Sequence, residues 1–154
     1  MSRPSPVRPT PGPLLLAAAV VLIDQLSKAW VLRHPQPRPL LPGLLDLQLV
    51  HNDGAAFSLF GQGALWLGWI SLAVSVGLLV ALIGFGAGWG PWQRQAAGWL
   101  LGGTLGNGLD RWRLGAVTDF LALRPIAFPV FNVADVAINV AVVCLLIHTW
   151  RERR

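Results

Sequence analysis

Charged residues are scarce in this sequence. Only 12% of its 154 residues are charged, whereas a soluble domain normally carries about a quarter, and 54% are hydrophobic. The mean hydropathy is +0.56. These values exclude an ordinary water-soluble fold. They predict a polytopic, all-α membrane protein in which residues 1–154 form a single membrane-embedded domain.

Cysteine and histidine are equally rare, and this bears on disulfides and metals. The one cysteine, Cys144, lies in an apolar run, so no disulfide can form within the chain, and we expect a small buried hydrophobe. His34, His51 and His148 lie far apart, and no His/Cys pair has the spacing of a metal site. The sequence therefore predicts neither a bound metal nor a cofactor.

The net charge of +5 is not concentrated in a binding stripe. Basic residues lie near both ends of the chain, and they do not alternate with aromatics, which argues against nucleic-acid binding. The terminal arginines are Arg3, Arg8, Arg151, Arg153 and Arg154. Beside apolar segments, such residues are typical anchors facing anionic lipid and the cytoplasm.

Four segments are long and apolar enough to cross a bilayer core of about 30 Å. We expect transmembrane helices at about 13–32, 64–86, 96–114 and 131–150, preceded by a disordered, Pro-rich tail over 1–12. A basic start followed by PLLLAAAVVLI also fits a signal peptide, but DQLSKAW continues the segment without a clear cleavage site. A retained first helix is favoured. Four spans place both termini on one side, and the terminal arginines favour the cytoplasm.

The connections between these spans have distinct patterns. Residues 33–43 hold four prolines and a glycine and are expected to form a loop, as are residues 115–130. Residues 44–52, LLDLQLVHN, alternate like a short strand, and DGAAF at 53–57 supplies a turn that could return the chain as a second strand. We expect a small sheet at the membrane surface. In the third span, Gly102, Gly103, Gly106 and Gly108 predict a closely packed helix interface.

Polar residues gather at one predicted membrane face. Each lies near the same end of its span or in the adjoining loop, except Asn139, which lies about two turns into the last span. The set comprises Asp24, Lys28, Thr104, Asn107, Asp110, Arg111, Asp119, Asn132, Asp135 and Asn139. A carboxylate in a membrane segment is costly unless it has a partner or a function. This convergence is therefore more informative than any one of these residues, each of which alone would read as a solvated helix end.

The charge balance within the set predicts a pair of catalytic carboxylates. Arg111 could pair with a carboxylate, and Lys28 could neutralise Asp24, which leaves Asp119 and Asp135 without an obvious cation. Two carboxylates in a low-dielectric site would share one proton and titrate as a unit. That is the arrangement of an aspartic protease, in which one carboxylate takes a proton from water and the other donates to the carbonyl oxygen.

Other interpretations are weaker. Ser27 and Lys28 form the one Ser/Lys pair, but adjacent side chains diverge on a helix, which disfavours a Ser–Lys nucleophile. A small ion- or proton-coupled transporter would spread its carboxylates through the membrane depth instead of gathering them at one face. A membrane assembly factor without enzymatic activity would tolerate Asp→Asn at positions 119 and 135.

Five motifs in order resemble the bacterial lipoprotein signal peptidases, also called signal peptidase II. They are DQLSKAW (24–30), NDGAAFSLF (52–60), GGTLGNGLDR (102–111), VTDF (117–120) and FNVADVAIN (131–139). The resemblance covers about residues 14–150. It implies an aspartic endopeptidase of the inner membrane that removes the signal peptide from prolipoproteins, cleaving just before a cysteine that already carries diacylglycerol.

The resemblance also implies roles for individual residues. It places the catalytic pair at Asp119 and Asp135. It assigns positioning and substrate binding to Asp24, Lys28, Asn52, Gly54, Asn107, Asp110, Arg111 and Asn132. It implies a small extracytoplasmic β-cradle at residues 44–60, between the first two spans, and a loop over the site at 115–130, a position that suits a lid. It further implies sensitivity to the cyclic peptide globomycin.

Overall fold

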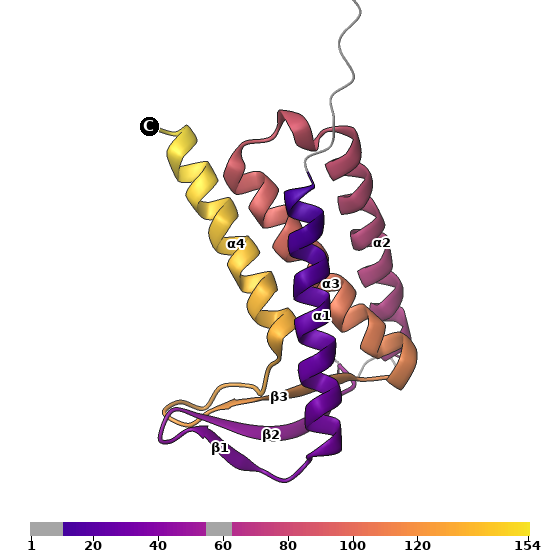
Figure 1. Ribbon diagram of the computed structural model, residues 1–154, viewed down its shortest axis with the longest axis vertical. Helices are drawn as coiled ribbons and strands as arrows, with labels where there is room; N and C mark the ends of the chain where they lie inside the picture. The colour runs from indigo at the N-terminus through magenta and orange to yellow at the C-terminus, as the bar shows by residue number, and fades with distance from the viewer. Residues whose placement is uncertain (1–10, 55–62) are drawn as a thin grey trace, which may run out of the picture.

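The computed structural model describes residues 11–54 and 63–154 (Figure 1). Within these ranges the helices are α1 (Gly12–Arg33), α2 (Gly63–Gly84), the 3-10 turn η2 (Gly86–Gly88), α3 (Pro91–Leu114) and α4 (Val133–Glu152). The strands are β1 (Arg38–Leu41), β2 (Leu45–Asn52) and β3 (Val117–Leu123). Residues 1–10 of the tail predicted at 1–12 lie outside the described residues, and α1 begins at Gly12. The expected span at 96–114 begins earlier, at Pro91.

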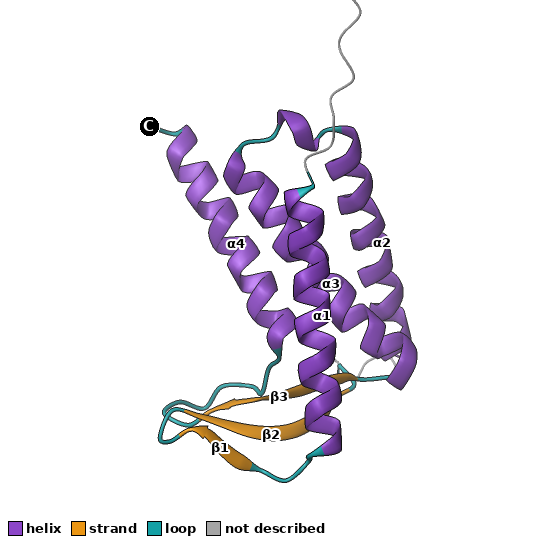
Figure 2. Cartoon of the chain, viewed as in Figure 1, coloured by secondary structure: helices purple, strands orange, loops and turns teal. Residues whose placement is uncertain are grey.

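The helices form a bundle with the sheet across one end (Figures 1 and 2). α1 and α3 run toward the sheet, whereas α2 and α4 run away from it, so the start of α1 and the C-terminus lie together at the opposite end. A basic cluster from α3 and the end of α4 occupies that opposite end. It comprises Arg94, Arg151, Arg153 and Arg154, and Arg151 and Arg154 lie over the rings of Trp92 and Trp150.

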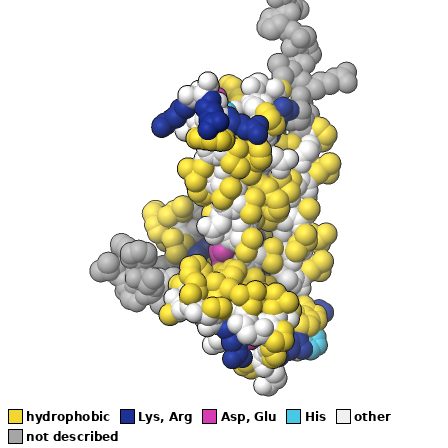
Figure 3. Space-filling view, turned by 90° about the vertical axis from the view of Figure 1, so that its left-hand side faces the viewer, with side chains coloured by type: hydrophobic (Ala, Val, Ile, Leu, Met, Phe, Trp, Pro, Cys, Tyr) yellow, Lys and Arg dark blue, Asp and Glu magenta, His cyan; other side chains and the backbone are white. Residues whose placement is uncertain are grey.

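Three of the described helices are long and apolar enough to cross a membrane, namely Gly12–Arg33, Leu65–Gly84 and Val133–Glu152. Their outward faces carry exposed Leu, Ile, Val and Trp side chains, and Figure 3 shows apolar side chains over the helical body with Lys and Arg toward its two ends. α3 is more polar, and it packs against each of the other three helices. Asn107 and Asp110 of α3 are buried by this packing, whereas Gln95 and Arg113 nearer its ends are exposed.

The sheet differs from the predicted one in the origin of its strands. Its order is β1-β2-β3, with both pairs antiparallel. The strand predicted at 44–52 is confirmed as β2, but both of its partners come from segments predicted to be loops, 33–43 and 115–130. The second strand expected after the turn at 53–57 falls partly outside the described residues.

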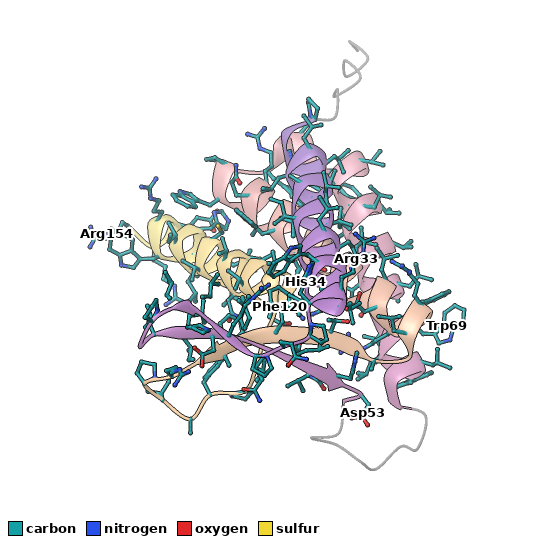
Figure 4. All side chains as sticks on the ribbon, turned by 60° about the horizontal axis from the view of Figure 1, so that its bottom comes forward. Arg33, His34, Asp53, Trp69, Phe120 and Arg154 are labelled. Atoms are coloured by element: carbon teal, nitrogen blue, oxygen red, sulfur yellow. The ribbon has the colours of Figure 1, made fainter. Side chains whose placement is uncertain are left out.

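The physical reason for these two wrong predictions is in the local sequences. β1 contains Pro39, which an edge strand tolerates because one side of it has no partner. The first four residues of β3, Val117 to Phe120, are all buried, so they lack the alternation that marks a half-exposed strand. Figure 4 shows Phe120 between β3 and the ends of α1 and α4, where it packs with Val31 and Leu47.

The glycines of α3 allow close contact with its neighbours, as predicted. A Cβ atom on Gly102 would lie 2.6 Å from Val20 Cβ of α1, and one on Gly103 would lie 2.7 Å from the Ala134 carbonyl oxygen of α4. A Cβ atom on Gly106 would lie 2.6 Å from Asp24 Oδ2. These distances are shorter than side-chain contacts allow, so α1 and α4 reach their positions because α3 has no side chains there.

Gly106→Ala is expected to destabilise the bundle by about 1–3 kcal/mol, because the added methyl group overpacks the contact with Asp24. The melting temperature of the detergent-solubilised protein measures this. Gly77→Ala is the matched control, since a Cβ atom there would meet nothing within 4 Å. We expect Gly77→Ala to melt at or slightly above the wild-type temperature, because alanine is the better helix former. Equal melting temperatures for the two variants would contradict the close-contact argument.

Candidate active site

The start of α4 carries the first carboxylate of the site. Asn132 is the N-cap residue, and its Oδ1 accepts a hydrogen bond from the backbone N–H of Asp135 (2.9 Å). Asp135 Oδ2 in turn accepts from the backbone N–H of Asn132 (3.1 Å), which completes a capping box. Asp135 is thus fixed in the first turn of α4, where the positive end of the helix dipole favours a negative charge.

The second carboxylate, Asp119, lies on β3 and is only 2% exposed. Its Oδ1 accepts from Asn132 Nδ2 (2.6 Å), and its Oδ2 accepts from Asn52 Nδ2 (2.9 Å) at the end of β2. Asn52 is itself oriented, because its Oδ1 accepts from the backbone N–H of Gly54 (3.0 Å). Gly54 has φ of +82°, a conformation that glycine adopts without strain.

Asn107 of α3 connects the two carboxylates. Its Nδ2 donates to Asp135 Oδ1 (2.8 Å), and its Oδ1 accepts from Asn132 Nδ2 (3.0 Å), the group that also donates to Asp119. The same Oδ1 accepts from Lys28 Nζ (3.0 Å). Two amide side chains therefore hold both carboxylates in fixed orientations and link them to a buried cation.

Lys28 belongs to a buried ion cluster beneath the two carboxylates. Its Nζ lies 2.8 Å from Asp24 Oδ2 and 3.1 Å from Asp110 Oδ2, and all three side chains are at most 3% exposed. The predicted pairing of Lys28 with Asp24 is confirmed. Asp110 takes Lys28 as its partner as well, so it is not paired with the adjacent Arg111.

Arg111 makes no ion pair with any described residue within 4.0 Å. One of its Nη atoms lies 3.5 Å from the Asn107 carbonyl oxygen, and its Nε is buried without a hydrogen-bond partner among the described residues. Its charge nevertheless acts on Asp135, Asp119 and Asp110 through space. The prediction that Arg111 pairs directly with a carboxylate is therefore wrong, because Lys28 already occupies the position between Asp24 and Asp110.

The environment of Asp119 favours its protonated form. Burial raises the pKa of Asp119 above its ordinary value, and the charge of Asp135 raises it further. Hydrogen bonds from Asn52 and Asn132 and the charge of Lys28 oppose this shift without cancelling it. Asp119 therefore holds a proton at a pH where an exposed aspartate would have lost it.

Both carboxylates line a cavity of about 730 Å³ between α4, β3 and the chain that follows β3. The polar residues of its lining are Asn52, Asp119, Asp135 and Asn139, and the remainder are apolar: Leu123, Phe128, Pro129, Val130, Phe131, Val136, Val140 and Val143. The cavity is large enough for part of a chain-like ligand. It presents two carboxylates to that ligand within a mostly apolar lining.

The structure brings together the residues that the sequence placed at one membrane face. Asp24, Lys28, Asn107, Asp110, Asp119, Asn132 and Asp135 form one connected set of hydrogen bonds and ion pairs, and Asn52 joins it through Asp119. Asn139 lines the cavity but donates to the Asp135 carbonyl oxygen instead of a side chain, and Thr104 bonds to Ser75 of α2 and does not join the set. The spacing argument missed Gln25, because it adjoins Asp24 and does not follow it by three or four residues.

Comparison with known proteins gives the chain a family. The family described as signal peptidase (SPase) II matches residues 16–151. The lipoprotein signal peptidase of Synechococcus sp. (strain RCC307) is 59% identical over 143 residues, which cover 91% of this chain and 95% of that protein. The lipoprotein signal peptidase of Parasynechococcus marenigrum is 56% identical over 148 residues, covering 92% and 91% of the two chains.

Solved structures agree with this match at the level of the fold. A structure described as a bacterial membrane enzyme superposes with a TM-score of 0.81 at 25% identity, covering 90% of this chain and 92% of the other. A second, with the same description, gives 0.81 at 24% identity over 92% and 89% of the two chains. The family match over residues 16–151 includes the buried ion cluster and both carboxylates. With relatives more than 50% identical over most of its length, the chain belongs to the signal peptidase II family.

Proposed function

We propose that this membrane-embedded bacterial peptidase cleaves diacylglyceryl-modified prolipoproteins just before the lipidated cysteine, with water activated by Asp119 and Asp135. The substrate class follows from the relatives, which are called lipoprotein signal peptidases. One observation carries the catalytic assignment: both carboxylates open on a single apolar cavity while Asn107 and Asn132 hold their side chains.

The two environments support different roles for the carboxylates. Asp135, at the positive end of α4, is placed to act as the base that takes a proton from the attacking water. Asp119, whose pKa is raised by burial, is placed to donate its proton to the carbonyl oxygen of the scissile peptide bond. The water oxygen then bonds to the carbonyl carbon. As the C–N bond breaks, Asp135 gives its proton to the leaving nitrogen, and one hydroxyl proton of the tetrahedral diol returns to Asp119.

The cavity suits a substrate anchored in lipid. Its apolar lining includes Val136, Val140 and Val143 on the outward side of α4, and Phe128 from the chain after β3. Acyl chains and the apolar signal peptide could thus remain beside the helices while the scissile bond reaches the carboxylates. The segment after β3 would act as a lid, and globomycin would compete for the same cavity.

The placement in the membrane follows the distribution of charge. α3 has 24 residues, or about 36 Å at about 1.5 Å per residue, so it can form a fourth span alongside the three apolar helices. The basic cluster defined above lies at the end opposite the sheet and would face the cytoplasm with both termini. The sheet and both carboxylates would then lie at the extracytoplasmic face. We propose one monomeric domain over 1–154 that acts in contact with membrane lipid.

A gel-shift assay tests the proposal. Purified protein in lipid is given a diacylglyceryl-modified prolipoprotein and, separately, its unmodified form, with and without globomycin. Cleavage of the modified form alone, blocked by globomycin and absent in Asp119→Asn and Asp135→Asn, is the expected result. Cleavage by both variants would show that Asp119 and Asp135 are not the catalytic pair. A wild type that cut neither substrate would contradict the peptidase function and favour proton or ion transport.

Asn52→Leu is expected to move the alkaline limb of the kcat/KM profile to higher pH. The hydrogen bond from Asn52 stabilises the ionised form of Asp119 and lowers its pKa, so its loss lets Asp119 keep the proton to higher pH. A pH–rate series measures the shift. The control is Gln48→Leu, an exposed amide on the same strand, whose profile should match the wild type. A shift of the Asn52→Leu limb to lower pH would contradict this account.

A further inference from the structure

The buried ion cluster holds the backbone beside each proposed catalytic carboxylate. Asp24 Oδ1 accepts a hydrogen bond from the backbone N–H of Ala134 (2.9 Å), the residue before Asp135. Asp110 Oδ2 accepts from the backbone N–H of Thr118 (2.9 Å), the residue before Asp119. The distance between Asp24 and Asp110 therefore helps to set the distance between the two chain segments that bear the carboxylates.

Lys28 alone does not balance this cluster. Two carboxylates face one ammonium group, and all three side chains are almost completely buried. Like charges held close together in a low-dielectric environment repel one another, unless neutral donors also satisfy their oxygens. Backbone N–H groups already satisfy Asp24 Oδ1 and Asp110 Oδ2, and a donor placed between the two carboxylates lowers the repulsion that remains.

Gln25 supplies that donor. Its Nε2 lies 3.1 Å from Asp24 Oδ2, 3.0 Å from Asp110 Oδ1 and 3.1 Å from the Gly106 carbonyl oxygen. Its Oε1 accepts from an Nη atom of Arg113 (3.2 Å). Because the guanidinium group can only donate, this bond fixes the oxygen outward and the NH₂ group inward, toward the two carboxylates.

We propose that Gln25 is a positioning residue of the peptidase: by bonding Asp24 and Asp110 together, it sets the separation of the segments that carry Asp119 and Asp135. This inference rests on the proposed catalytic pair. Gln25 is only partly buried and lies on the side of α1 that faces α3, so it acts on the reaction through the cluster and not by contact with the substrate.

Gln25→Leu keeps the approximate size of the side chain and removes the donor. Its kcat is expected to fall by about 10- to 100-fold with KM changed by less than about threefold, because a small misplacement of reacting groups costs this much. Gln25→Glu keeps the shape and places an oxygen against the two carboxylates. Its kcat is expected to fall further than that of Gln25→Leu, an order that a space-filling role would reverse.

Gln93→Leu is the matched control. Gln93 is also a partly buried helical glutamine, but its Oε1 accepts from the Gly90 N–H at the far end of α3. Its loss should lower the melting temperature and leave kcat within about twofold of the wild type, because the proposed carboxylates are distant from it.

Three results would each overturn the proposal. The first is a wild-type kcat in Gln25→Leu, and the second is a higher kcat in Gln25→Glu than in Gln25→Leu. The third is an equal loss of kcat in Gln25→Leu and Gln93→Leu when the two variants have the same melting temperature. Asp119→Asn, measured in the same assay, distinguishes failure of the positioning role from failure of the proposed catalytic pair. An inactive Asp119→Asn with a fully active Gln25→Leu would overturn only the positioning role. An active Asp119→Asn would remove the catalytic pair itself.

Discussion

Asparagine at position 119 or at position 135 is expected to lower kcat for the lipidated prolipoprotein by about 10³-fold or more. Each substitution keeps the size of the side chain and removes the ionisable oxygen, so proton transfer to or from the reacting groups is lost, and such transfer contributes about 10²- to 10⁴-fold. Single-turnover cleavage followed by gel shift measures the effect without interference from product release.

The double variant Asp119→Asn/Asp135→Asn tests whether the two carboxylates act as one unit. If they share a proton, removal of either one disables the pair, and the double variant should be no slower than the slower single variant. A double variant slowed by about the product of the two single losses would contradict the shared mechanism.

Asp46→Asn is the matched control for these variants. Asp46 lies on β2 and pairs with Ala122 of β3 in the register, so it belongs to the same sheet as Asp119. Its carboxylate bonds to the exposed Arg124 and does not line the cavity. Asp46→Asn should retain kcat within about twofold, since it removes no group from the proposed reaction.

The sequence was informative about the site because membrane segments penalise polar residues. Asp24, Lys28, Asn107 and Asp135 stood out for that reason, and helical spacing indicated which of them share a face. Three helices long and apolar enough to cross a membrane could be predicted from the length of their apolar runs, since lipid leaves few other ways to satisfy a backbone. Charge counting then isolated Asp119 and Asp135 as the carboxylates without a cation.

The sequence was less informative where long-range pairing decides the structure. β1 and β3 are strands because they pair with β2, and neither carries an alternating pattern of its own. The expectation that Arg111 pairs with a carboxylate was wrong for a related reason. Arg111 is the neighbour of Asp110 in the chain, but helix packing brings Lys28 of α1 to Asp110. Spacing along one helix cannot report contacts that two helices make together.

Lys28→Met is expected to cause the largest loss of stability, about 3–5 kcal/mol. Lys28 is 2% exposed, and without it Asp24 and Asp110 remain buried as two carboxylates with no cation between them. Methionine retains much of the apolar stem, so the loss reports on charge more than on volume. Thermal unfolding of purified protein should show a melting temperature lower by roughly 10 °C.

Two further variants separate buried charge from other effects of Lys28→Met. Arg124→Gln removes a cation from the exposed pair with Asp46 and should leave the melting temperature almost unchanged, because solvent screens such pairs. Lys28→Met/Asp110→Asn removes one of the two uncompensated charges while asparagine can still accept from the Thr118 N–H. The double variant should therefore melt above Lys28→Met, since neutral replacement of a buried ion pair is tolerated far better than its half-removal. A double variant no more stable than Lys28→Met would mean that packing around the lysine stem, and not the charge it balances, holds α1 against α3.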